Sequence, residues 1–115
     1  MRNRPYVTDM AIKPCIPPKT TDRNTSYPSG HAVMGFSMGA VLSRLIPEKS
    51  TAIMDRANLY AENRLICGLH HRSDIIAGQV LGTLVAMELL KNYEFQTLMF
   101  SAKQELINAG LTKEY

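Results

Sequence analysis

The 115-residue sequence predicts an all-α fold. Apolar residues recur at the three- and four-residue spacing of an α-helix along four long segments. Proline and glycine stand between these segments, where helices end. No segment shows the alternation of a β-strand, and the sequence has no internal repeat. Because 45% of the residues are hydrophobic, we expect one domain over residues 1–115.

The N-terminal part of this domain is predicted to be an irregular loop. Residues 5–28 hold five of the chain's six prolines, separated mostly by polar residues. Loops of this length are uncommon in compact domains and often carry function. We therefore expect a functional loop over residues 5–28, followed by a helical core over residues 29–110.

The first two long helices have clear sequence boundaries. The first is expected to start after Gly30 with Ser29 as its N-cap, and to stop at Pro47. The second is expected over about residues 50–67, where Gly68 follows as a natural stop. The apolar face predicted for the first helix comprises Val33, Phe36, Met38, Val41, Leu42, Leu45 and Ile46, and apolar residues of the second include Ile53, Leu59, Tyr60 and Leu65.

The last two helices are predicted over about residues 73–90 and 93–109. Ser73 is a suitable N-cap for the third helix, and its spaced Gly78 and Gly82 would permit close helix packing. The fourth helix is amphipathic and is expected to end at Gly110. We interpret the long apolar stretches, residues 32–46 and 75–90, as buried helices, because both are shorter than the roughly 20 residues of a membrane span.

Charge and composition narrow the function classes. The formal net charge is +3, and basic residues are scattered among acidic ones. Nucleic-acid binding is therefore disfavoured, because it usually requires a clustered basic face. A mild positive balance suits a small anionic substrate. The N-terminus lacks the apolar core of a signal peptide, and membrane association has little support.

The two cysteines, Cys15 and Cys67, allow two interpretations. They are either buried thiols of a reducing compartment or one disulfide that ties the N-terminal loop to a core helix. Sequence reasoning alone leaves both open.

Ser29, Gly30 and His31 form a candidate anion site. A serine that caps a helix lies beside unpaired backbone N–H groups, and these groups bind anions. Gly30 has no side chain to keep an anion away from the backbone. His31 would stand beside that anion. The alternative is an ordinary serine cap with an incidental histidine.

Arg64, His70 and Asp74 form a second candidate cluster. Gly68 breaks the helix between Arg64 and His70, so both side chains can reach one point. Asp74 follows His70 by four residues. A carboxylate that accepts the proton of one imidazole nitrogen leaves the other as a nucleophile. The arginine offers a planar fork of donors suited to phosphate oxygens. The alternative is a surface Arg–Asp pair beside a structural histidine.

A metal site made from His31, His70, His71 and Asp74 is the competing interpretation. These residues lack the spacing of recognised zinc motifs, so phosphate is the preferred ligand. Adjacent histidines point in different directions, so His70 and His71 are not both expected to be catalytic.

Together these residues resemble the signature of the class A bacterial acid phosphatases. That family belongs to the superfamily of type 2 phosphatidic acid phosphatases and vanadium haloperoxidases. The signature reads Lys-x6-Arg-Pro, Pro-Ser-Gly-His and Ser-Arg-x5-His-x3-Asp. This sequence has Arg4-Pro5, then Pro28-Ser29-Gly30-His31, then Asn63-Arg64 with His70 and Asp74 at the same offsets. Ser26-Tyr27, Ile66-Cys67-Gly68 and the placement of Cys15 and Cys67 are also similar.

The resemblance implies a helical bundle of the acid phosphatase and haloperoxidase type, and it implies residue roles. His70 would be the nucleophile that forms a phosphohistidine, and Asp74 would orient it. His31 would protonate the leaving alcohol and then activate water. The phosphate oxygens would be held by Arg4, Ser29, Gly30 and Arg64. The family needs no metal or other cofactor.

Two departures from the signature set further expectations. Asn63 replaces the usual serine, and the signature lysine would lie ahead of Met1. We therefore expect the chain to be the C-terminal part of a longer enzyme. Apolar surface left bare by absent helices would favour a homo-oligomer.

The predicted function is hydrolysis of small organic phosphomonoesters, in the periplasm by family resemblance. One alternative is a non-catalytic relative that binds phosphate. Another is a membrane-associated lipid phosphatase.

Overall fold

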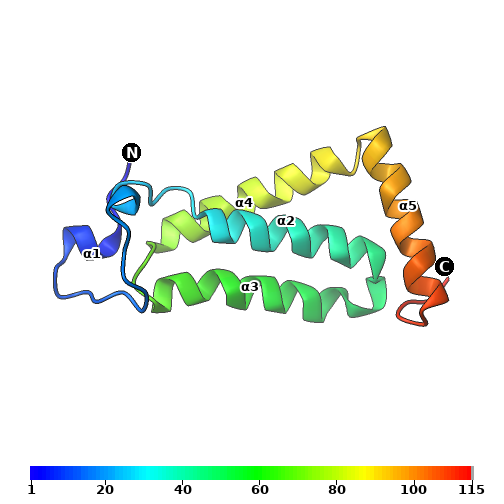
Figure 1. The fold of residues 1–115 in the computed structure, drawn as a ribbon, viewed down its shortest axis with the longest axis horizontal. Helices are drawn as coiled ribbons and strands as arrows, with labels where there is room; N and C mark the ends of the chain where they lie inside the picture. The colour runs from blue at the N-terminus through cyan, green and yellow to red at the C-terminus, as the bar shows by residue number, and fades with distance from the viewer. Residues whose placement is uncertain (115) are drawn as a thin grey trace.

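Four long α-helices follow an N-terminal segment that contains one short helix (Figure 1). The structure is a computed structural model that describes residues 1–114. No β-strand occurs in this range, so the predicted all-α class is confirmed. The elements are α1 (Pro5–Thr8), the 3₁₀ turn η1 (Thr20–Asp22), α2 (Gly30–Leu45), the 3₁₀ turn η2 (Pro47–Lys49), α3 (Ser50–Ile66), α4 (Arg72–Leu89) and α5 (Tyr93–Asn108).

Most helix boundaries lie where local chemistry predicts them. The Ser29 side chain accepts a hydrogen bond from the Ala32 N–H and caps α2, as expected. Pro47 directly follows the end of that helix and opens η2. Gly68 has a φ of 69°, a left-handed conformation that only glycine adopts readily, and it lies just beyond the end of α3.

The start of α4 differs from the prediction. The N-cap is His71, not Ser73, so the helix begins at Arg72. The Asp74 carboxylate accepts a hydrogen bond from the backbone N–H of His71 at 2.7 Å. This contact satisfies an N–H group at the helix terminus and lets the chain turn two residues earlier than a serine cap would.

The N-terminal segment is more ordered than an irregular loop. Besides α1 and η1, it pairs Arg2 with Thr25 in an isolated bridge. The backbone N–H of Arg4 donates to the Arg23 carbonyl at 2.9 Å, and that of Ser26 donates to the Arg2 carbonyl at 3.1 Å. The segment therefore doubles back on itself and carries Arg2 and Arg4 to the same end of the helices (Figure 1).

Helix α2 lies between α3 and α4 and packs against both. Buried residues of these three helices form the core: Ala32, Phe36, Ala57, Ala61 and Ile75. Gly78 and Gly82 of α4 face α2, as predicted. A Cβ at Gly78 would lie only 2.6 Å from the Ala32 Cβ, and one at Gly82 would meet the backbone carbonyl of Val33. The two glycines let the helix backbones approach closely.

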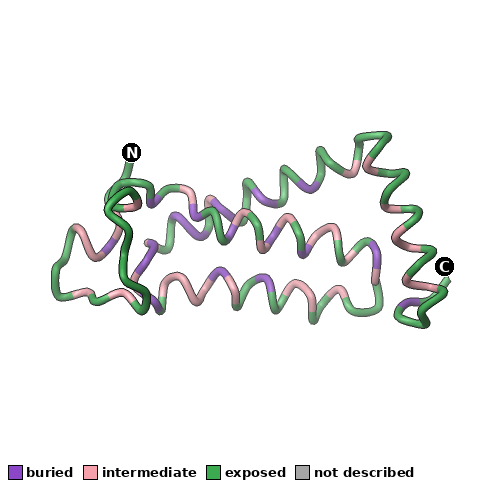
Figure 2. Tube along the Cα trace, in the orientation of Figure 1, coloured by how far each residue is buried: buried purple, intermediate pink, exposed green. Residues whose placement is uncertain are grey.

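The long apolar stretches are not buried helices, contrary to expectation. In α4 only Asp74, Ile75, Gly78, Gly82 and Ala86 are buried. Several of the predicted face residues of α2 and α3, including Met38, Leu42 and Leu59, are exposed. Exposed positions run along all the long helices in Figure 2. The reason is that, in the described chain, α2 packs along its length against α3 and α4 and touches α5 only slightly, so each helix keeps an uncovered apolar side.

Helix α5 crosses the end of the other long helices that lies opposite the N-terminal segment, and it contacts α2 there (Figure 1). It buries no residue, and its axis is bent by 90° from that of α4. Within residues 1–114 no single helix is long and apolar enough to cross a membrane; α4 and α5 reach that length and composition only as a bent pair. The Cα radius of gyration is 16.9 Å, against about 13 Å for a compact domain of this length.

Candidate active site

The candidate site lies where the N-terminal ends of α2 and α4 meet the C-terminal end of α3 and the N-terminal segment. A backbone hydrogen bond of 3.0 Å from the Ser29 N–H to the Asp74 carbonyl joins the starts of α2 and α4. The turn after α3 is held by two backbone donors, Leu69 and His70, which share the Arg64 carbonyl at 3.0 and 3.3 Å. The structure thereby brings the two sequence-predicted clusters together.

Ser29 and Gly30 present the N-terminus of α2 to this region. Ser29 is fully buried, and its hydroxyl is occupied by the Ala32 N–H at 3.3 Å. Gly30 is exposed, and no other atom lies within 4 Å of the position that a Cβ would take. The first turn of α2 therefore offers open backbone N–H groups of the kind that bind anions.

His70 is the buried histidine of the site, with only 4% of its surface exposed. Its Nδ1 lies 2.8 Å from the Ser26 carbonyl oxygen. A carbonyl can only accept, so Nδ1 carries the proton. In a neutral imidazole this arrangement makes Nε2 the nitrogen with the free lone pair. The geometry thus presents Nε2 as the nucleophilic atom.

Asp74 contacts His70 less directly than the sequence suggested. The carboxylate was expected to accept the imidazole proton, but its Oδ2 lies 3.6 Å from Nδ1, beyond hydrogen-bond distance. The same oxygen accepts a hydrogen bond of 2.6 Å from the Ser26 hydroxyl. Its Oδ1 accepts one of 2.9 Å from Arg2 Nη1. Asp74 therefore supports the residue that holds His70.

The two arginines of the signature differ in how they are held. Arg4 donates from Nε to the Asp22 carbonyl at 2.8 Å and from Nη1 to the Leu69 carbonyl at 3.4 Å. These contacts fix its guanidinium next to the His70 turn. Arg64 has a buried Nε with no partner in the described part of the chain. A buried donor without an acceptor is costly, so an anion bound beside Arg64 would satisfy it.

His31 lies on the exposed side of the site. Its ring packs against the ring of Tyr60 from α3, with centroids 5.7 Å apart and a tilt of 49°. Partial burial, together with the positive charges of Arg64 and Arg4, lowers the pKa of His31 below its ordinary value of 6.5. Both arginines therefore favour the neutral form of His31.

Burial, neighbouring charges and hydrogen bonds together shift the pKa values of His70 and Asp74. Burial and the Arg4 charge lower the pKa of His70 below 6.5, although the Ser26 carbonyl and Asp74 act against that shift. For Asp74, burial alone would raise the pKa. Hydrogen bonds from Ser26 and His71 and the Arg2 charge outweigh it, so the pKa lies below 3.8. The pKa values of His70 and Asp74 are therefore both lowered, which favours the neutral imidazole and the ionised carboxylate.

Sequence reasoning missed three residues at the site: Arg2, Ser26 and Tyr60. Ser26 entered the sequence analysis only through the family resemblance. Its position three residues before Ser29 is the feature of the sequence that could have indicated its role. Arg2 lies two residues before Arg4 and has no motif of its own in the signature. The contact of Tyr60 with His31 joins α3 to α2 and has no local signal in the sequence.

A disulfide between Cys15 and Cys67 closes the N-terminal segment onto the end of α3. The backbone N–H of Cys15 also donates to the Cys67 carbonyl at 3.1 Å. Cys67 directly precedes the turn that ends in His70. The bond therefore links the N-terminal segment to the His70 turn. Within residues 1–114, no cluster of His, Cys, Asp or Glu has an arrangement that could hold a metal ion.

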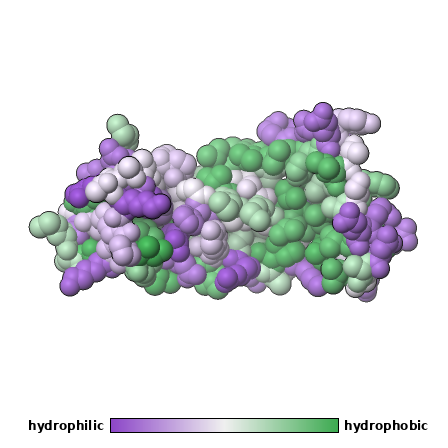
Figure 3. Space-filling model, viewed as in Figure 1, coloured by the Kyte–Doolittle hydropathy of each residue, from purple (hydrophilic) through white to green (hydrophobic). Residues whose placement is uncertain are grey.

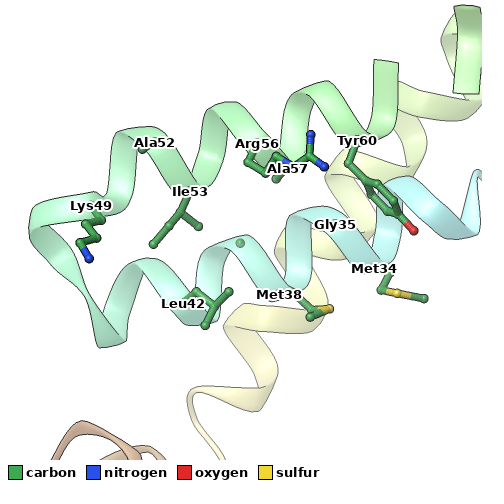
Figure 4. A pocket seen from close by; sticks show the side chains of 11 residues that line it. Met34, Gly35, Met38, Leu42, Lys49, Ala52, Ile53, Arg56, Ala57 and Tyr60 are labelled. Carbon is green, nitrogen blue, oxygen red and sulfur yellow. The ribbon is translucent and has the colours of Figure 1, made fainter. Parts of the chain in front are cut away.

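An apolar groove begins at Tyr60 and runs between α2 and α3 (Figure 4). Its volume is about 510 Å³. Met34, Met38, Leu42 and Ile53 are among the residues that line it. Lys49 and Arg56 are its charged members. The groove is a separate hollow from the His70 turn.

Comparison with known proteins identifies the family of this chain. Residues 1–97 match the PAP2 superfamily. This chain belongs to that superfamily. Of its relatives, an acid phosphatase of Zymomonas mobilis is 33% identical over 94% of this chain and 41% of the relative. Non-specific acid phosphatases of Providencia stuartii and Salmonella typhimurium are 37% and 34% identical, over 72% and 92% of this chain.

These relatives confirm the resemblance to bacterial non-specific acid phosphatases that the motifs indicated. The PAP2 match covers the segments that supply Arg4, His31, Arg64, His70 and Asp74. The chain spans 34–43% of the length of the three relatives.

Proposed function

We propose that this PAP2 chain supplies the catalytic centre of a phosphomonoesterase that works through a phosphohistidine at His70. The observation that carries the proposal is the hydrogen bond from His70 Nδ1 to the Ser26 carbonyl. It holds the proton on the nitrogen away from the reaction and leaves Nε2 as the nucleophile. The lowered pKa of His70 supports the same role, because it favours the neutral ring, the form that has a free lone pair.

In the first step, Nε2 of His70 attacks the phosphorus of the monoester. A P–N bond forms, and the bond from phosphorus to the alcohol oxygen breaks. Protonated His31 gives its proton to the departing oxygen, so the alcohol leaves neutral. In the second step, neutral His31 takes a proton from water, whose oxygen attacks phosphorus. The P–N bond breaks, and inorganic phosphate and free His70 are formed.

The phosphate would lie against the N-terminus of α2, with the guanidinium groups of Arg4 and Arg64 beside it. The backbone N–H of Gly30 would donate to its oxygens, whereas that of Ser29 already donates to the Asp74 carbonyl. Transition-state charge in phosphoryl transfer is spread over these oxygens, and fixed donors and positive charges stabilise it. The unsatisfied Nε of Arg64 supports this placement. Because the protein groups supply the nucleophile, proton and positive charge, we propose metal-independent chemistry.

The substrate class that we propose is small organic phosphomonoesters. Relatives named non-specific acid phosphatases support a broad substrate range and acidic working conditions. The disulfide between Cys15 and Cys67 suits an oxidising compartment, and we propose the periplasm.

The direct test is hydrolysis of p-nitrophenyl phosphate at acidic pH by the chain and by His70→Ala. We expect turnover by the wild type, its loss in the variant, and an acid-labile phosphoryl group trapped on His70. The matched control is His71→Ala, which removes the neighbouring histidine; its ring contacts the Asn3 carbonyl and, in the capping box of α4, the Asp74 backbone N–H. A well-folded chain that shows no turnover and no trapped phosphoryl group would contradict the proposal.

The second candidate is a non-catalytic phosphate-binding chain. The observation in its favour is that the chain spans about two fifths of its acid phosphatase relatives. Inorganic phosphate that raised the melting temperature without any turnover would select this candidate. A lipid phosphatase is the third candidate, and activity only on phosphatidic acid in detergent would select it.

We also propose that the chain self-associates through its uncovered apolar surface. Its accessible surface is 7671 Å². A compact monomer of this mass exposes about 6,300 Å², so the excess is about 1,400 Å². A stable interface buries about 800 Å² per partner. Figure 3 shows apolar surface gathered over the middle of the molecule, where α2 and α4 lie.

A further inference from the structure

The buried carboxylate of Asp74 is fully occupied by donors. Its side chain has no exposed surface. Arg2 Nη1 donates to Oδ1 at 2.9 Å. The Ser26 hydroxyl and the His71 backbone N–H donate to Oδ2 at 2.6 and 2.7 Å. A buried charge persists only when it is paired and hydrogen-bonded. Within residues 1–114, Arg2 is the one cation in ion-pair contact with Asp74 apart from the His70 ring.

Ser26 connects this carboxylate to the nucleophile. It is fully buried. Its hydroxyl donates to Asp74, while its carbonyl accepts the Nδ1 proton of His70 at 2.8 Å. Its own backbone N–H donates to the Arg2 carbonyl at 3.1 Å. Both ends of Ser26 are therefore held, and the direction of its carbonyl depends on Arg2 and Asp74.

Arg2 faces Asp74 rather than the phosphate region. The guanidinium also contacts the Ser73 hydroxyl, and the Arg2 backbone N–H donates to the Asn24 carbonyl at 3.1 Å. Arg4, two residues later, instead influences both histidines through its charge. The two arginines thus have different tasks, although their side chains come from the same short segment.

We propose that Arg2 and Ser26 are positioning residues of the phosphohistidine site. Arg2 keeps Asp74 ionised, Asp74 holds the Ser26 hydroxyl, and the Ser26 carbonyl keeps the proton of His70 on Nδ1. This arrangement, the Arg2–Asp74–Ser26 relay, fixes the tautomer in which Nε2 can attack phosphorus. The kinetic part of the inference rests on the proposed phosphatase function, whereas the tautomer part does not.

The test compares Arg2→Met, Arg2→Lys and Ser26→Ala with the wild type. Ser26→Ala removes the hydroxyl but keeps the carbonyl, so it cuts only the link to Asp74. When either the Arg2–Asp74 pair or the Ser26–Asp74 hydrogen bond is removed, we expect kcat to fall by about 10- to 100-fold. A loss of this size is typical when the hydrogen-bond partner of a metal-bound histidine is removed. KM should change little, because Arg2 does not face the phosphate region. Arg2→Lys should recover part of kcat.

The control is Arg23→Met, which removes the same charge from the same N-terminal segment. Arg23 is exposed, and only its backbone contacts Arg4. We expect kcat and its pH profile to remain those of the wild type.

A second readout needs no activity. Nitrogen NMR of the His70 ring should show the proton on Nδ1 in the wild type and a mixture of tautomers in Ser26→Ala and Arg2→Met. An unchanged Nδ1–H tautomer and unchanged kcat in the folded variants would overturn the relay. If the wild type is inactive but the tautomers respond as expected, the phosphatase proposal fails while the relay stands. If Arg2→Met does not fold, the His70 tautomer measured by nitrogen NMR in Ser26→Ala and Arg2→Lys decides whether the relay exists.

Discussion

The backbone N–H of Ser29 donates to the carbonyl of Asp74 at 3.0 Å, across 45 residues of sequence. This bond joins Ser29, the cap of α2, to Asp74 in the first turn of α4. The N-terminal end of α2 and the His70 turn are therefore held at a fixed separation. Close packing of the two helices behind the bond maintains it, because Gly78 lies directly against Ala32 and Ser29.

Gly78→Ala should destabilise the fold. The new Cβ would lie 2.7 Å from the Ser29 carbonyl oxygen and 2.6 Å from the Ala32 Cβ. We expect the free energy of unfolding to fall by about 1–3 kcal/mol, as for other overpacked cores, measured by urea denaturation. Gly30→Ala is the matched control, since its Cβ meets no atom within 4 Å. It should retain stability but bind phosphate more weakly. Equal stability in both variants would contradict the packing argument.

Arg64→Gln should move the alkaline limb of the activity profile. As the proposed general acid, His31 must be protonated, so kcat/KM should fall as pH rises through its pKa. Arg64 lowers that pKa. Its removal should raise the pKa of His31 and shift the alkaline limb to higher pH. The rate itself should fall by about 10²- to 10³-fold, as when one transition-state donor is lost.

The control for this shift is Arg56→Gln, two turns earlier on α3. Arg56 is exposed and lines the apolar groove rather than the histidine site. We expect its alkaline limb to match that of the wild type. Two results would show that the alkaline limb does not report a His31 group influenced by Arg64. One is an alkaline limb that shifts equally in both variants, and the other is a limb that shifts to lower pH in Arg64→Gln.

Replacing both cysteines with serine should lower stability more than it lowers activity per folded molecule. The disulfide closes a loop between positions 52 residues apart. Loop-closure entropy of this length gives a stabilisation of about 4 kcal/mol. Urea denaturation with and without reductant would measure the loss. A wild-type chain whose stability does not respond to reductant would contradict a stabilising role for the bond.

Val80→Glu should dissociate the proposed oligomer. Val80 lies on the uncovered side of α4 and is 55% exposed. A charge there would be buried without a partner in an interface between two copies. Sedimentation velocity should show an oligomer for the wild type and a monomer for the variant. Gln79→Glu adds a charge at the adjacent exposed position as a control for net charge. A monodisperse wild-type monomer would refute self-association through this surface.

The sequence by itself determined the all-α class, most helix ends and the residues of the candidate site. These features depend on local chemistry: Ser29 caps its own helix, Pro47 and Gly68 stop theirs, and the spacing of Arg64, His70 and Asp74 identifies a family signature. Gly78 and Gly82 likewise predicted a close helix contact, because two helix backbones can approach this closely only where a side chain is missing.

The tertiary structure alone decided which atoms meet. It directed the Nδ1–H of His70 to the Ser26 carbonyl rather than to Asp74, and it brought Arg2 to Asp74 across 72 residues. It also decided which apolar residues are buried, since periodicity gives the apolar face of a helix but not whether another helix covers it. Burial and hydrogen-bond partners depend on elements distant in the chain, and no local pattern in the sequence records them.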